Sequence, residues 1–242
     1  AGIRRKEGVR YIGLVANERG LLRAREANCD SIALFTATST SFTKANVGMS
    51  VPESLIRYRQ LCSLARRYDM AVRGYVSTIF KCPFEGEINA QEVLRVTREL
   101  LDMGCYEVSL GDTTGIGTPN DVRRVMECVV PEVGTDRIAL HLHDTWGMAI
   151  ANVLTGFEFG IDHYDASAGG LGGCPFAKGA RGNLATEDLL YLLDGMGLDT
   201  PVSLEAVARA ASVLAEEMGK PLTSRAHRAF MSARGAAGES IC

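Results

Sequence analysis

Short apolar runs alternate along the chain with longer amphipathic stretches. Six apolar runs predict strands, at residues 9–15, 31–35, 70–76, 106–110, 138–143 and 163–167. The stretches between and after them have apolar positions at helical spacing and predict helices at 19–27, 52–68, 90–103, 121–130, 147–159, 186–195 and 204–218. Strands that alternate with helices in this way indicate parallel βαβ units in one sheet.

Two α/β architectures fit this alternation. A TIM (β/α)8 barrel needs eight strands, whereas an open doubly wound sheet is satisfied by six. The first strand is followed by Asn17-Glu18-Arg19-Gly20 and not by a glycine-rich dinucleotide fingerprint. No low-complexity linker divides the chain, so residues 1–242 are expected to form a single domain. The small, polar tail at 232–242 is expected to be mobile.

Composition narrows the function classes. A net charge of −3 argues against non-specific nucleic-acid binding, which needs a basic surface. The seven cysteines are scattered without C-x-x-C spacing, which favours reduced thiols over a disulfide scaffold or structural zinc. No apolar run approaches the length of a membrane span. A cytoplasmic protein is therefore expected, or a mitochondrial one if upstream residues carry a transit peptide.

The strongest local signal for chemistry is a pair of histidines on a predicted strand. His141 and His143 flank Leu142, and residues two apart on a strand point to the same face. Both lie at the carboxyl end of that strand, where barrel active sites are built. Two neutral imidazoles on one face can bind a divalent metal. The alternative is a hydrogen-bonded polar pair without a metal.

A glycine-rich loop follows the last predicted strand and contains a cysteine. Its Gly172 and Gly173 let the backbone approach a ligand closely, and Cys174 follows them directly. A thiol on such a loop can serve as an acid–base group. The alternative is a hinge loop with an incidental thiol.

Three further polar residues each have a structural and a functional interpretation. Asn183 either caps the helix that follows or offers its amide oxygen to a metal. Asp112, at the end of a strand, either closes an Asx turn or lines a pocket. Arg73, inside an apolar strand, either extends outward between helices or binds a partner inside the barrel, such as Asp112 or an anionic ligand.

Several runs of sequence together resemble the 3-hydroxy-3-methylglutaryl-CoA lyase family. They are VRGYVS, CPFEGEI, MGCYEVSLGDTTGIGTP, HLHDTWGMAIAN and SAGGLGGCPFAKGARGNLATEDLLYLLDGMG, in the order that the family has. The resemblance runs from about residue 9 to about residue 218. The Gly-Gly-Cys-Pro loop is that family's own signature. The H-x-H pair and the later asparagine also occur in the wider superfamily of aldolase-type barrels. One departure is Gly170, where alanine is usual.

The resemblance implies a function for each matched residue. His141, His143 and Asn183 would bind Mg²⁺ or Mn²⁺, Cys174 would be the loop cysteine required for catalysis, and Asp112 and Arg73 would line the pocket. The family's remaining metal ligand is an aspartate, preceded by a catalytic arginine, on a first barrel strand, and no such run precedes residue 9. A TIM barrel whose first two strands are missing from this sequence is therefore expected.

The resemblance also implies a reaction and partners. The substrate would be an acyl-CoA, cleaved to acetoacetate and acetyl-CoA, with His141 as a candidate base and Cys174 protonating the carbanion. The protein would form a homo-oligomer, a dimer or higher, without nucleic-acid or membrane partners. A condensing enzyme of the same superfamily, a related acyl-CoA lyase and an inactive barrel remnant are the alternatives. Thioester cleavage, as opposed to acetyl transfer to a 2-oxo acid, would distinguish lyase from synthase.

Overall fold

A computed structural model describes residues 2–173 and 182–236 of the chain. Six strands form one sheet in which all neighbours are parallel, in the order β1-β2-β3-β6-β7-β8. Their bounds are β1 (Ile12–Leu14), β2 (Ser31–Ala37), β3 (Ala71–Ser77), β6 (Glu107–Asp112), β7 (Ile138–Leu142) and β8 (His163–Asp165). The six predicted strands and their parallel arrangement are confirmed, although β1 and β8 are shorter than predicted.

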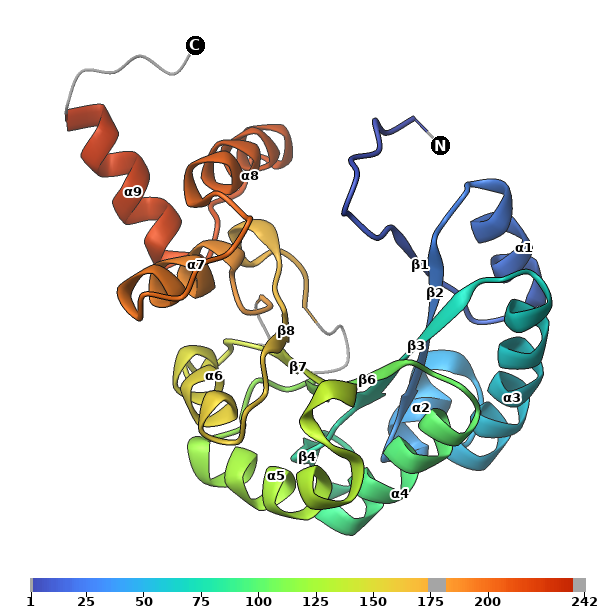
Figure 1. Cartoon of the computed structure of the whole chain (residues 1–242). Helices are drawn as coiled ribbons and strands as arrows, with labels where there is room; N and C mark the ends of the chain where they lie inside the picture. The colour runs from blue at the N-terminus through green and yellow to red at the C-terminus, as the bar shows by residue number, and fades with distance from the viewer. Residues whose placement is uncertain (1, 174–181, 237–242) are drawn as a thin grey trace.

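The sheet is curved, and helices from the N-terminal and middle parts of the chain cover its outside (Figure 1). Their bounds are α1 (Glu18–Glu26), α2 (Thr40–Val47), α3 (Val51–Arg67), α4 (Ala90–Asp102), α5 (Pro119–Val133), α6 (Ala149–Glu158), α7 (Thr186–Gly195), α8 (Leu204–Met218) and α9 (Arg225–Ala236). Helices α1, α3, α4, α5 and α6 line the convex side, and the concave side faces an open centre. The result is a half-barrel, since an open doubly wound sheet would carry helices on both faces.

Strand alternation decides which side chains face the helices. Val72, Val108 and Leu140 are fully or almost fully buried under the helices. Their neighbours one position along point to the concave face. The helices pack their apolar faces against this side of the sheet. Helix α4, for example, buries Val93, Val96 and Leu100. The apolar layer between sheet and helices is therefore the core, and the concave face is left for polar groups.

Local signals define several helix ends. Helix α3 begins with a capping box. The Ser50 hydroxyl oxygen accepts from the Glu53 backbone N–H, and the Glu53 carboxylate accepts from the Ser50 backbone N–H. Pro52 lies in the first turn, where its missing N–H costs no helical hydrogen bond. A small hairpin of β4 (Lys81–Cys82) and β5 (Gly86–Glu87) follows β3. Helix α2 and this hairpin were not predicted from the sequence.

The C-terminal region differs from the expectation of a mobile tail. Residues 232–236, the first part of that tail, belong to helix α9. Residues 237–242 lie outside the described part of the chain. The start of α9 is held by Asp188 of α7, whose carboxylate accepts from the Ser224 hydroxyl at 2.7 Å and from the Ala226 backbone N–H at 2.7 Å. Within the described residues, none of the helices has the length and apolar character of a bilayer-spanning segment.

Candidate active site

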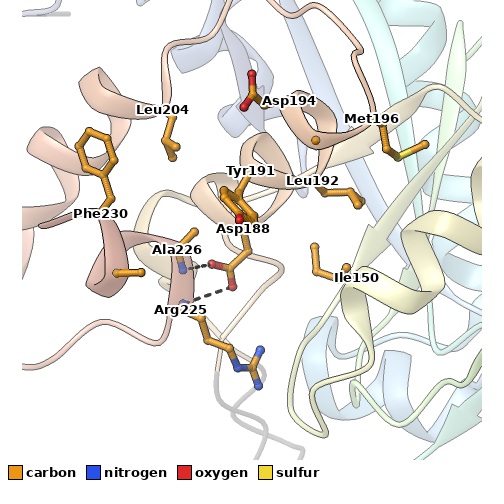
Figure 2. A pocket seen from close by; sticks show the side chains of 12 residues that line it. Ile150, Asp188, Tyr191, Leu192, Asp194, Met196, Leu204, Arg225, Ala226 and Phe230 are labelled. Atoms are coloured by element: carbon orange, nitrogen blue, oxygen red, sulfur yellow. Dashed lines mark hydrogen bonds between the residues drawn. The ribbon is translucent and has the colours of Figure 1, made fainter. Parts of the chain in front are cut away.

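The concave face of the half-barrel carries a cleft of about 320 Å³ over its central strands. Tyr75 of β3, Ser109 of β6 and His141 of β7 all line it. A larger cleft of about 850 Å³ lies between α6, α7, α8 and α9 and is mainly apolar (Figure 2). The smaller cleft is the better candidate for catalysis because polar groups from adjacent strands converge in it.

The two histidines lie together, as the spacing predicted. The ring centroids of His141 and His143 are 5.3 Å apart. His143 is only 5% exposed, and its Nδ1 has no hydrogen-bond partner among the described residues. Burial lowers the pKa of His143 to about 4, with a smaller contribution from His141. A neutral, buried imidazole with an unused nitrogen fits a metal ligand better than a self-contained polar pair.

Asn183 is brought beside His143 by backbone pairing. The Leu184 backbone N–H donates to the Leu142 carbonyl at 2.8 Å, and Asn183 forms an isolated antiparallel bridge with His143. Residues directly opposite in such a pair share a face. The Asn183 Nδ2 donates to the Leu171 carbonyl at 2.8 Å, which leaves the amide oxygen as the atom suited to a cation. His141, His143 and Asn183 therefore come together.

The capping interpretation of Asn183 is wrong. Helix α7 begins at Thr186, with Ala185 as its N-cap and without a side-chain cap. Glu187, in the first turn of α7, is fully buried and accepts from the Gly169 backbone N–H at 2.8 and 3.0 Å. Glu187 therefore holds the start of the glycine loop in place.

The glycine loop depends on glycine at two described positions. Gly170, where the resemblance expects alanine, has φ +68°, and a Cβ there would lie 2.4 Å from the Thr223 hydroxyl oxygen. Gly172 has φ +100°, and a Cβ there would lie 2.6 Å from the Asn183 side-chain nitrogen. Any side chain at Gly172 would thus displace Asn183. Gly173 follows, and Cys174, the catalytic thiol expected from the sequence, lies outside the described residues.

Arg73 points to the concave face and is held by two carboxylates. Its Nε donates to Glu107 and its Nη1 donates to Asp165 at 2.7 Å and to the Tyr75 hydroxyl. The Arg73 side chain is 8% exposed. The inward placement was predicted, but Asp112 as its partner was wrong. Glu107 and Asp165 could have been found from strand parity, because register places Glu107 beside Arg73 and Asp165 beside His141.

Asp112 faces away from this cluster. It is 1% exposed, and its carboxylate accepts from the Gly117 backbone N–H at 2.9 Å. The contact closes the loop after β6, which is the structural interpretation weighed for this residue. Burial raises the pKa of Asp112 to about 6, although backbone N–H groups of residues 115–117 oppose the shift. A catalytic role for Asp112 stays a prediction.

Asp112 should make folding stability depend on pH. Its carboxyl group has a pKa of about 6 in the folded protein, above the value of roughly 3.9 for an unfolded chain. The contribution of Asp112 to the free energy of unfolding is therefore complete below about pH 4. It is lost as the pH rises through 6, by up to about 3 kcal/mol. We expect Asp112→Asn to remove this part of the slope in urea unfolding between pH 4.5 and 7.5. The exposed Asp102→Asn should retain it; an unchanged slope in Asp112→Asn would contradict the assignment.

The larger cleft lies where α9 packs against the rest of the C-terminal helices. Figure 2 shows Asp188 bonded to the backbone of Arg225 and Ala226, while the Arg225 side chain extends away from the cleft. The Arg225 guanidinium reaches Asp144, directly after His143, at 3.0 Å. The C-terminal helix is thereby linked to the loop that follows the two histidines.

The fold and this site together define an α/β half-barrel enzyme class with polar groups gathered on the concave face. The chain belongs to the HMGL-like family, whose model matches residues 6–214. It is 47% identical over 233 residues to the rat protein named 3-hydroxy-3-methylglutaryl-CoA lyase, cytoplasmic, covering 96% of this chain and 68% of that protein.

Solved structures agree with this family. The hydroxymethylglutaryl-CoA lyase from Pseudomonas aeruginosa superposes with a TM-score of 0.93 at 43% identity, covering 96% of this chain and 77% of that one. An HMG-CoA lyase from Acinetobacter baumannii, solved with coenzyme A and 3-methylmalate, superposes with a TM-score of 0.89 at 35% identity, covering 94% and 74%. Both carry the arrangement of strands seen here over nearly the whole chain.

Proposed function

We propose that this chain is the catalytic domain of a divalent-metal-dependent carbon–carbon lyase that cleaves 3-hydroxy-3-methylglutaryl-CoA to acetoacetate and acetyl-CoA. One observation carries the proposal: in a chain of the HMGL-like family, backbone pairing sets Asn183 opposite His143, with His141 on the same strand face. The CoA-bound relative supports an acyl-CoA substrate.

The half-barrel corresponds, in this proposal, to strands three to eight of a closed (β/α)8 barrel in a single domain. The first two strands would lie outside this sequence, between β8 and β1. The exposure of Leu14 on the edge strand β1, at 73%, supports a missing neighbour there. The P. aeruginosa structure, of which this chain covers 77%, contains further chain that could fill the gap.

Mg²⁺ or Mn²⁺ suits the donors that are present. His141, His143 and the Asn183 amide oxygen would hold the cation, and the unpartnered Nδ1 of His143 is the observation that fits this best. Among the described residues, no group of three or more His, Cys, Asp or Glu side chains forms a metal cluster. The substrate and residues outside this sequence would complete the ligands. A bound cation would supply acidification of the substrate's tertiary hydroxyl.

The chain's own residues would do the rest. His141 is the candidate base expected from the sequence, but a ring that faces Asp165 with Nδ1 and binds the cation with Nε2 has no lone pair for the hydroxyl proton, so we assign His141 to the cation. Gly172 and Gly173 would let the loop approach the thioester, and Cys174 would return a proton to the acetyl-CoA carbanion as the carbon–carbon bond breaks. Arg73 lies on the same concave face but is neutralised by Glu107 and Asp165, so we assign it to the support of the site and not to the thioester oxygen.

An acetoacetate-release assay tests the proposed reaction. Purified protein with Mn²⁺ or Mg²⁺ should cleave the thioester, and EDTA should stop the release until cation is restored. Acetyl transfer from acetyl-CoA to a 2-oxo acid, without cleavage, would instead identify a condensing enzyme. The absence of both activities in correctly folded protein would favour the inactive barrel. Size-exclusion chromatography with light scattering tests the expected homo-oligomer.

The position of Cys174 can be tested by chemical labelling. If the thiol lies next to the substrate, bound acyl-CoA should slow its alkylation, because the ligand covers the loop. Cys128, which is partly exposed on α5, provides an internal control that should label at the same rate with and without ligand. Peptide mass spectrometry separates the two sites. Equal labelling of Cys174 under both conditions would separate this thiol from the substrate site.

A further inference from the structure

Asp165, on β8, is held by three different strands of the concave face. Its Oδ1 accepts from Arg73 of β3 at 2.7 Å, and its Oδ2 accepts from the Ser109 hydroxyl of β6 at 2.7 Å. The same Oδ2 lies 3.3 Å from Nδ1 of His141 on β7. Both carboxylate oxygens of Asp165 are therefore held in place by side chains of the protein itself.

The contact with His141 is not explained by the neutralisation of Arg73. Glu107 already pairs with the Arg73 Nε, and Asp165 uses its other oxygen, Oδ1, for the guanidinium. Oδ2 faces only Ser109 and His141 among the contacts within the described chain. The Ser109 hydroxyl thus holds Asp165 Oδ2 in place as an acceptor for Nδ1 of His141.

An ionised carboxylate can only accept hydrogen bonds, so the ring nitrogen that faces it must carry the proton. Asp165 is the carboxylate of an ion pair with Arg73 at 2.7 Å and accepts from the Ser109 hydroxyl at 2.7 Å, and both contacts favour its ionised form. His141 is therefore protonated at Nδ1 and has its lone pair on Nε2.

We propose that Asp165 is a positioning residue that locks His141 in the Nδ1–H tautomer and so presents Nε2 to the divalent cation. Ligating histidines commonly donate their second nitrogen to a carboxylate, which fixes the ring and strengthens the ligand. The cation part rests on the proposed function, whereas the tautomer part does not. His143 contrasts with it, because its Nδ1 has no partner among the described residues.

Imidazole ¹⁵N NMR tests the tautomer without a metal. The chain has four histidines, so the signals can be assigned with His163→Gln and His227→Gln variants. Wild-type protein should show His141 protonated at Nδ1. In Asp165→Asn that tautomer should lose its dominance, since the amide can donate to Nδ1. The exposed Asp162→Asn, one residue before β8, is the control and should leave the His141 signals unchanged. His141 protonated at Nε2 in wild type would overturn the proposal, whatever the stability of the variants.

Mn²⁺ affinity, measured by the EPR signal of free Mn²⁺, tests the second part. Asp165→Asn should weaken binding roughly 10–100-fold, the usual effect of losing such a carboxylate, and Asp162→Asn should stay within about twofold. Unchanged affinity in Asp165→Asn would overturn the positioning role. Failure of wild-type protein to bind Mn²⁺ would count against the proposed function, while the NMR result would still decide the tautomer.

Discussion

His143→Ala should lower Mn²⁺ affinity below detection and reduce acetoacetate release by about 10³-fold or more. Removing a single charge-stabilising donor from an active site already costs about 10²–10³ in rate, and a metal ligand contributes more than one donor. The imidazole is almost completely buried, and its Nδ1 has no hydrogen-bond partner among the described residues. Removing Nδ1 therefore breaks no hydrogen bond at that atom. We therefore expect the variant to fold.

His227→Ala is the matched control for this prediction. His227 lies on α9, and its Nε2 contacts the Ser212 hydroxyl of α8 at 2.9 Å, away from the strand that carries His143. That variant should keep both Mn²⁺ affinity and turnover. Circular dichroism establishes that both proteins fold. If His143→Ala retained tight Mn²⁺ binding and normal turnover, the metal site would have to be elsewhere.

Local pattern was sufficient to predict the strands and the face of the two histidines. The period of the apolar residues fixed six strands, and the H-x-H spacing placed His141 and His143 on one side of β7. Both depend only on neighbours in the chain, which a single sequence records. The choice between an open sheet and a half-barrel depends on curvature, which no local period encodes.

Contacts that depend on the pairing register of distant strands were harder to predict from the sequence. Asp165 and Glu107 meet Arg73 only because β3, β6, β7 and β8 pair in one particular register. Asn183 was left between two roles because its bridge to His143 joins segments far apart in the chain. Asp112 was paired with Arg73, although strand parity places the two side chains on opposite faces. Parity, applied strand by strand, would have corrected that last error.

Arg73→Met should destabilise the fold by about 3–5 kcal/mol, the typical cost of breaking a buried ion pair from one side. The Glu107 and Asp165 side chains are 8% and 21% exposed, so both would be left as unpaired, poorly hydrated charges. Methionine replaces the length of the arginine stem without its charge. The loss therefore comes from electrostatics and not from an empty cavity. Urea unfolding at pH 8 measures it.

The pH dependence separates this explanation from a packing effect. With Arg73 present, the pKa of Asp165 is about 2, so its stabilising contribution is complete above about pH 4 and is lost as the pH falls through 2. Without the Arg73 charge, burial meets less opposition from the remaining His141 and Ser109 contacts and this pKa rises. We expect it to rise above the unfolded value, so that stability is lost as the pH rises through the new value. The difference between wild type and Arg73→Met should thus be larger at pH 8 than at pH 5. Arg123→Met, which breaks the exposed pair with Glu158, should cost no more than about 1 kcal/mol at both values. An equal loss at pH 5 and pH 8 in Arg73→Met would mean that packing, and not the charge of Arg73, holds the concave face together.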